Sequence, residues 1–141
     1  MKKTIAFLLA LLLICFSATA CGQLRIQSES WSFVIATQGE AVTHVAPAYL
    51  DSTLDGTPTL EGTLTAGGGE FTFTDKTNGK TYTGTYEDRE EVNPNAVDYR
   101  ITVGRTRGRA LISNGLTESG KETTTLTLYL GNYTLLFVAE E

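Results

Sequence analysis

Cysteine is nearly absent from this 141-residue chain, which contains only Cys15 and Cys21. Cys15 lies in an apolar N-terminal run of the kind that is removed on export. One cysteine would then remain, so no internal disulfide can form. After this run, no second apolar stretch is long enough to cross a bilayer as a helix. The sequence therefore predicts a domain that is held together by packing alone.

Basic residues and histidine are also scarce, with eleven Lys and Arg against sixteen Asp and Glu. Without Lys2 and Lys3 of the N-terminal run, nine basic residues face sixteen acidic ones, a net charge of −7. This acidic balance argues against nucleic acid and against electrostatic docking on anionic lipid. The one histidine, His44, has no nucleophile-elbow glycines or ligand cluster near it, so we expect polar surface there. We expect no enzyme activity, metal or cofactor.

The N-terminus has the pattern of a signal peptide. Lys2 and Lys3 precede an apolar run over residues 5–16, and small residues follow as far as Ala20. The run has about a dozen residues, which is too short to span a bilayer core of ~30 Å. Removal of residues 1–20 from the 141 would leave 121, which suits a single domain.

The motif Ala18-Thr19-Ala20-Cys21 resembles the lipobox of bacterial lipoproteins, in which the cysteine becomes the lipid-carrying first residue. The usual leucine three places before the cysteine is Ala18 here. We expect acyl chains on Cys21 to anchor the protein to the outer side of the cell membrane, since stable anchoring needs more than one chain. Residues 21–29 would form the lipidated N-terminus and a short tether. The alternative is ordinary cleavage and secretion, with Cys21 as a free thiol.

From Ser30 onward the apolar residues alternate with period two, and no helix is convincing. Residues 46–58, between Pro47 and Pro58, could be a lid, a helical turn or a long loop. Residues 87–95 and 114–120 are expected as loops. The expected strands cover residues 30–35, 42–45, 59–65, 70–75, 80–87, 97–103, 109–113, 123–130 and 133–139.

Short glycine turns predict how the middle strands pair. Asn78-Gly79, as a two-residue hairpin loop, would place Phe73 opposite Gly84. A similar loop at Gly67-Gly68 would place Phe73 opposite Gly62 as well. The Phe73 ring would then lie between two glycines, whose missing side chains make room for it.

The last hairpin turns at Gly131-Asn132 and should pair Leu128 with Leu135 on a wholly apolar face. Eight or nine such strands in sequence must close on themselves or pack against a second sheet. The predicted fold is an all-β, small antiparallel up-and-down barrel over residues 30–141, with a two-sheet sandwich as the alternative. A barrel of ~8 strands has room for side chains or for one small ligand.

The exported chain, with Trp31 in its first strand and a meander of short strands, resembles the bacterial lipocalin-like lipoproteins. The resemblance is carried by Tyr82-Thr-Gly-Thr-Tyr86, Tyr99-Arg-Ile-Thr-Val103 and the closing hairpin, and covers most of residues 30–139. Lipocalins have Gly-x-Trp before the first strand, where this chain has Glu29-Ser30-Trp31. The resemblance implies a lipocalin-like barrel, although the bacterial families mostly have no assigned function.

Two sets of side chains are candidates for binding. Aromatic residues could line a ligand cavity, or simply fill the barrel. The cations Arg105, Arg107 and Arg109 alternate, so an extended chain carries them on one side, where they could bind a carboxylate, phosphate or anionic glycan. They could equally balance nearby acids or protect a strand edge. The aromatic candidates are Trp31, Phe33, Phe71, Phe73, Tyr82, Tyr86 and Tyr99.

The acidic residues Glu87, Asp88, Glu90 and Glu91 lack the spacing of a calcium loop, and we expect a solvated loop there. The sequence thus favours a monomeric, membrane-anchored and non-enzymatic lipoprotein whose barrel binds a small apolar molecule or an envelope component. The alternative is an envelope interaction or scaffold protein with a solid barrel core. Whether the interior is hollow distinguishes the two.

Overall fold

The computed structural model describes residues 24–117 and 119–140, most of them in strands. The expected signal peptide and Cys21 lie outside the described residues. Three short 3₁₀ helices are η1 (Ile26–Ser28), η2 (Pro47–Tyr49) and η3 (Ser52–Leu54). The strands are β1 (Trp31–Gln38), β2 (Ala41–Val45), β3 (Gly62–Gly67), β4 (Glu70–Asp75), β5 (Lys80–Asn93), β6 (Ala96–Val103), β7 (Thr106–Leu116), β8 (Glu122–Leu130) and β9 (Tyr133–Ala139).

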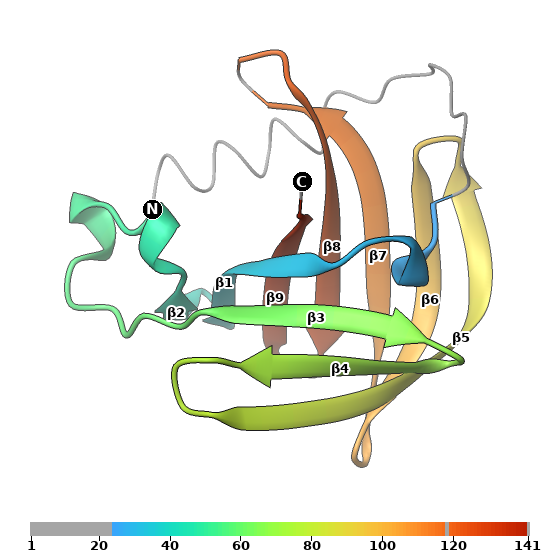
Figure 1. Cartoon of the computed structure of the whole chain (residues 1–141), viewed down its shortest axis with the longest axis horizontal. Helices are drawn as coiled ribbons and strands as arrows, with labels where there is room; N and C mark the ends of the chain where they lie inside the picture. Colours follow the sequence, from blue (N-terminus) through green and yellow to red (C-terminus); the bar gives the residue numbers. More distant parts are fainter. Residues whose placement is uncertain (1–23, 118, 141) are drawn as a thin grey trace.

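The sheet closes into a barrel. Strands β3 to β9 pair in chain order, and β1 pairs with both β3 and β9, so eight strands form a closed antiparallel ring with β2 as an extra strand. Strands β1, β3 and β4 run across the view of Figure 1, β6 to β9 run nearly perpendicular to them, and the long β5 bends between the two sets. The predicted small up-and-down barrel is confirmed, and the two-sheet sandwich is wrong.

The seam of the barrel lies between β1 and β3. These strands pair only through Trp31 with Leu64 and Ser32 with Thr63. From Ile35 onward, β1 pairs with the short strand β2 instead of with β3. Val45, at the end of β2, forms a bridge with Thr59 just before β3. The extra strand therefore continues the sheet where β1 and β3 separate.

Residues 46–58 form the helical turns η2 and η3, which is one of the three structures expected there. On β9, Phe137 belongs to the interior core, whereas its neighbour Leu136 belongs to a second apolar cluster. Because neighbouring strand residues face opposite sides, this second cluster lies on the outer face of the barrel. Leu54 of η3 and Val34 of β1 are buried in it. The connection thus packs against the outer wall.

The pairing of β4 with β5 differs from the predicted register by two residues. Phe73 lies opposite Tyr82, and Phe71 lies opposite Gly84. The reason is a four-residue turn over 76–79, where the buried Asp75 accepts hydrogen bonds from the backbone N–H (3.0 Å) and the side-chain amide (2.9 Å) of Asn78. A shift of two residues keeps every side chain on its predicted face.

The prediction that one phenylalanine lies between two glycines is also wrong, but each glycine does make room for a ring. A Cβ on Gly62 would lie 2.4 Å from the Phe73 ring, and one on Gly84 would lie 2.4 Å from the Phe71 ring. The β8–β9 hairpin has the predicted register, with Leu128 opposite Leu135.

The acidic stretch over 87–95 is not a loop, because β5 continues to Asn93 and pairs with β6. A bulge interrupts the pairing at Asp88, which has φ +54°. Asp88 forms an exposed ion pair with Arg100 of β6, at 3.0 Å. Asp88 and Arg100 can carry charge because both side chains are more than half exposed to water.

The loop predicted over 114–120 is too long. Asn114 and Gly115 belong to β7 and pair with Thr124 and Thr123 of β8. The Asn114 side chain accepts a hydrogen bond from the Thr124 hydroxyl at 2.6 Å. Asn-Gly is a common turn sequence, but here the cross-strand pairing of a long hairpin overrides it.

The turn at Asp75 predicts a dependence of stability on pH. The hydrogen bonds from Asn78 hold the pKa of Asp75 below its ordinary value of 3.8. A carboxyl whose folded-state pKa is depressed stabilises the fold above the unfolded pKa, and this contribution disappears as the pH falls through the folded pKa. We expect Asp75→Asn to be less stable than the parent near pH 7 and the gap to narrow below 3.8. Urea denaturation over this range checks it, and a gap independent of pH would contradict it.

Candidate functional site: the aromatic end of the barrel

One end of the barrel is closed by the segment before β1. Ile26 of η1 is fully buried in the interior core. Its backbone N–H donates to the Tyr99 hydroxyl (3.3 Å), and its carbonyl accepts from the indole N–H of Trp31 (2.9 Å). The carbonyl of Leu24 accepts from Nε of Arg89 at 3.1 Å. The described part of the expected tether is therefore packed against the barrel, which the polar residues around Ile26 did not indicate.

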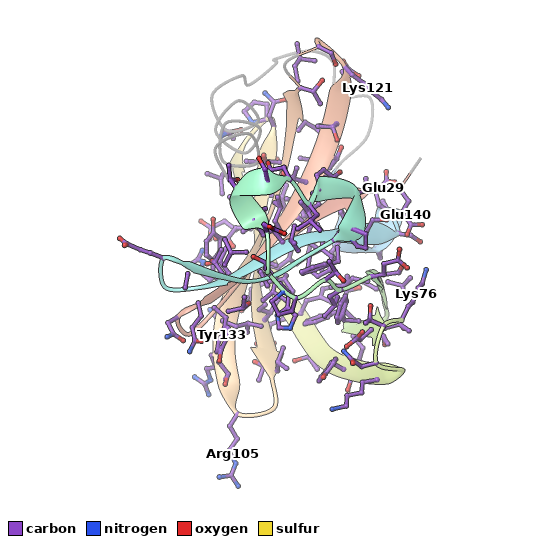
Figure 2. The ribbon with its side chains drawn as sticks, turned by 90° about the vertical axis from the view of Figure 1, so that its left-hand side faces the viewer. Glu29, Lys76, Arg105, Lys121, Tyr133 and Glu140 are labelled. Atoms are coloured by element: carbon purple, nitrogen blue, oxygen red, sulfur yellow. The ribbon has the colours of Figure 1, made fainter. Side chains whose placement is uncertain are left out.

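We call this the closed end; it carries η1, the β3–β4 turn (68–69), the β5–β6 turn (94–95) and the β7–β8 connection. The opposite end, which we call the aromatic end, carries the turns at 39–40, 76–79, 104–105 and 131–132. Figure 2 shows the separation of the two ends, with Lys121 of the β7–β8 connection at the top and Arg105 of the β6–β7 turn at the bottom.

Two half-exposed tyrosines and a partly buried ring characterise the aromatic end. Tyr82 is 48% exposed and stacks on Phe73, with ring centroids 6.3 Å apart and an interplanar angle of 24°. Tyr133 is 45% exposed. It begins the same inward-facing row of β9 that continues with Leu135 and Phe137. The inner apolar surface of the barrel therefore reaches solvent at this end.

Below this rim, aromatic rings contact one another across the interior. The Phe33, Phe73 and Phe137 ring centroids lie 5.6 to 6.1 Å apart, although these residues come from β1, β4 and β9. Near the closed end, Tyr86 and Tyr99 meet edge to face at 5.5 Å. Tilted contacts of this kind stabilise aromatic pairs beyond the area that they bury.

The seven predicted ligand-binding aromatics thus lie at different depths. Trp31, Phe33, Phe71 and Tyr99 are buried, and Trp31 and Tyr99 hold the closing segment. Phe73 and Tyr86 are half-buried, and Tyr82 alone among the seven is exposed at the aromatic end.

Sequence reasoning did not include Tyr133 among the ligand-binding residues. The period-two row Tyr133-x-Leu135-x-Phe137 contains the signal that places it on the inner face. Which members of such a row reach solvent depends on where the turns end the strands. The chain order of the residues alone does not give this.

The three predicted arginines lie outside the barrel. Ala110 of β7 faces the core, so its neighbour Arg109 and the next alternate residue, Arg107, lie on the outer face of the strand. Arg105 lies in the turn before β7. Arg109 forms an ion pair with Asp98 of β6, and this hydrogen bond raises the pKa of Arg109. The other carboxylate oxygen of Asp98 is buried and has no hydrogen-bond partner among the described residues. Arg109 therefore neutralises a buried acid on the outer wall, and only Arg105 of the three cations lies in a turn of the aromatic end.

Within residues 24–117 and 119–140, no group of three or more His, Cys, Asp or Glu side chains is placed to hold a metal ion. The helical turns of these residues are all too short and polar to cross a membrane. His44 lies in β2, opposite Ala36. Comparison with known proteins found no matching family model, no matching curated sequence and no matching solved structure.

Proposed function

We propose that this chain is an exported, lipid-anchored and non-enzymatic lipocalin-like protein that binds a small apolar ligand or an envelope component at its aromatic end. The half-exposed Tyr82, stacked on the part-buried Phe73, carries the proposal. Aromatic side chains are large, and a tyrosine can cover an apolar ligand while its hydroxyl stays in water. Binding sites of this kind are lined mainly by apolar and aromatic side chains with few polar groups.

The depth of such a site is limited by the rings beneath it. Because Phe33, Phe73 and Phe137 contact one another across the interior, a ligand would bind between the rim tyrosines and these rings. The proposal is therefore a shallow site at the mouth, whose polar side is open to water.

The same ring contacts favour a second candidate function, that of an envelope interaction or scaffold protein with a solid core. In that case the loops and outer wall would contact another protein, and the rim tyrosines would have no ligand. The two candidates differ in whether apolar molecules bind at the rim.

The test uses binding of the neutral fluorescent probe N-phenyl-1-naphthylamine and three tyrosine variants. Tyr82→Ala and Tyr133→Ala should each weaken probe binding about tenfold, the loss of roughly one aromatic contact. Tyr129→Ala is the matched control, because Tyr129 is 43% exposed but lies on the outer face of β8. Equal effects of all three variants, or no probe binding by the parent, would contradict the ligand site and favour the solid scaffold.

Native mass spectrometry of residues 22–141, which lack the lipid-carrying Cys21, tests for a natural ligand when the protein is expressed with export and purified without detergent. An additional mass that is lost on denaturation would support the ligand-binding function and would indicate the chemical class of the ligand. A protein that carries no such mass and does not bind the probe would favour the scaffold function.

A further inference from the structure

We propose that the closed end of the barrel faces the membrane and that the aromatic end faces away from it, so that ligand or partner reaches the site from the aqueous side. This inference rests on the proposed lipid anchor at Cys21. It adds the orientation of the barrel, which follows from where Leu24 and Ile26 are attached to it.

The first step is that the segment before β1 is attached to the closed end and does not hang free. The buried Ile26 is hydrogen-bonded through its N–H to Tyr99 and through its carbonyl to Trp31. Leu24 is held two residues earlier by the hydrogen bond from Arg89 of β5. In Figure 1, η1 lies beside β6 at this end of the molecule.

The second step is the length of chain between the anchor and the barrel. Cys21 precedes Leu24 by three residue steps, and an extended chain covers at most ~11 Å over that distance. A free tether from Cys21 to Trp31 would have ten steps and a reach of ~35 Å, enough to let the barrel turn over. Because Leu24 is fixed to the barrel, only the shorter reach remains, and the closed end must stay near the lipid headgroups.

The third step is the distance to the other end. Strand β8 runs from Glu122 at the closed end to Leu130 at the aromatic end. Its length is ~26 Å along the strand, or ~20 Å along a barrel axis from which strands tilt by ~40°. The turn at 131–132 would thus lie roughly 20 Å further from the membrane than the closed end.

The charges at the closed end indicate that the short connection, and not surface attraction, sets this orientation. The carboxylates of Glu29, Glu70, Glu122 and Glu140 are exposed there, with the cations Arg25 and Lys121. Figure 2 shows Glu29 and Glu140 near each other, and the backbone N–H of Glu140 donates to the carbonyl of Ser30 at 2.8 Å. Because these carboxylates outnumber the cations, this end has no net attraction to anionic headgroups. Surface charge would therefore not hold a barrel on a longer connection in this orientation.

The test attaches residues 21–141, which include every described element, through the Cys21 thiol to a maleimide lipid in phosphatidylcholine vesicles. A ketone amino acid replaces Glu70 at the closed end or Asn132 at the aromatic end, and each receives a donor dye. Energy transfer to a rhodamine headgroup lipid is then measured. We expect transfer from position 70 to exceed transfer from position 132 about twofold or more, as a ~20 Å difference in height requires. Equal transfer, or stronger transfer from position 132, would overturn the orientation.

A matched variant isolates the cause. A Gly-Ser insertion of about a dozen residues between Gln23 and Leu24 leaves the barrel unchanged but adds ~20 Å of flexible reach. The difference between the two positions should then largely disappear, and a difference that persists would overturn the role of the short connection.

The lipid anchor is tested separately by intact mass of the full chain expressed with export, with Cys21→Ser as the control. Absence of acyl mass would overturn the anchor, and with it the membrane-facing role of the closed end. Equal energy transfer in vesicles would overturn the orientation alone.

Discussion

Replacing Phe137 with alanine is expected to lower the free energy of unfolding by about 3–5 kcal/mol, the usual cost of deleting a fully buried aromatic ring. Phe137 has no exposed surface and contacts the rings of Phe33 and Phe73, at 5.8 and 5.6 Å between centroids. Its removal would leave a cavity where strands β1, β4 and β9 meet. Since the free energy of unfolding of a small domain is commonly 5–15 kcal/mol, this loss is a large part of the whole.

Urea denaturation followed by tryptophan fluorescence measures the effect, because the one tryptophan, Trp31, is buried in the same core. The control is Tyr133→Ala, which removes a ring from the same row of β9 at a half-exposed position and should cost well under half as much. A loss below about 1 kcal/mol for Phe137→Ala would mean that the ring does not fill the interior. It would also remove the limit on the depth of the ligand site.

The second large effect is expected for Gly108→Ala, with a loss of about 3 kcal/mol, the upper part of the usual range for overpacking. Gly108 lies in β7 beside β8, and a Cβ there would lie 2.0 Å from the backbone carbonyl oxygen of Tyr129. A side chain can rotate away from such a clash, but a carbonyl in a strand ladder cannot. The two strands would have to separate, and the hydrogen bonds of the hairpin would lengthen.

Gly67→Ala provides the matched control, because a Cβ on Gly67 would meet no atom within 4 Å. We expect this variant to be neutral or slightly more stable than the parent, since alanine restricts the unfolded chain. Amide hydrogen exchange of β7 and β8 should increase in Gly108→Ala and stay unchanged in Gly67→Ala. Equal stability of the two variants would show that β7 and β8 lie further apart than described.

The candidate site was only partly accessible to sequence reasoning. The period-two rows place Tyr82 on the inner face of β5, but Trp31 and Tyr99, which belong to similar rows, hold the closing segment. Exposure depends on how far each strand extends past its neighbours, and this is set by turn lengths. The predicted register of β4 with β5 was wrong by two residues, because the turn has four residues and not the two of Asn78-Gly79. A single side chain, Asp75, stabilises the longer turn by hydrogen bonds, which shows why turn length is hard to predict.

The sequence by itself determined the all-β architecture, most strand positions and the inner face of each strand, because alternation of apolar and polar residues is a local property. It also determined the register of the last hairpin, where the turn at 131–132 has two residues. Only the tertiary structure decided that β9 closes on β1, that Ile26 seals one end, and that residues 46–58 cover the outer wall. These features join residues far apart in the chain. Their stability comes from burial of apolar surface against distant partners, which no local pattern encodes.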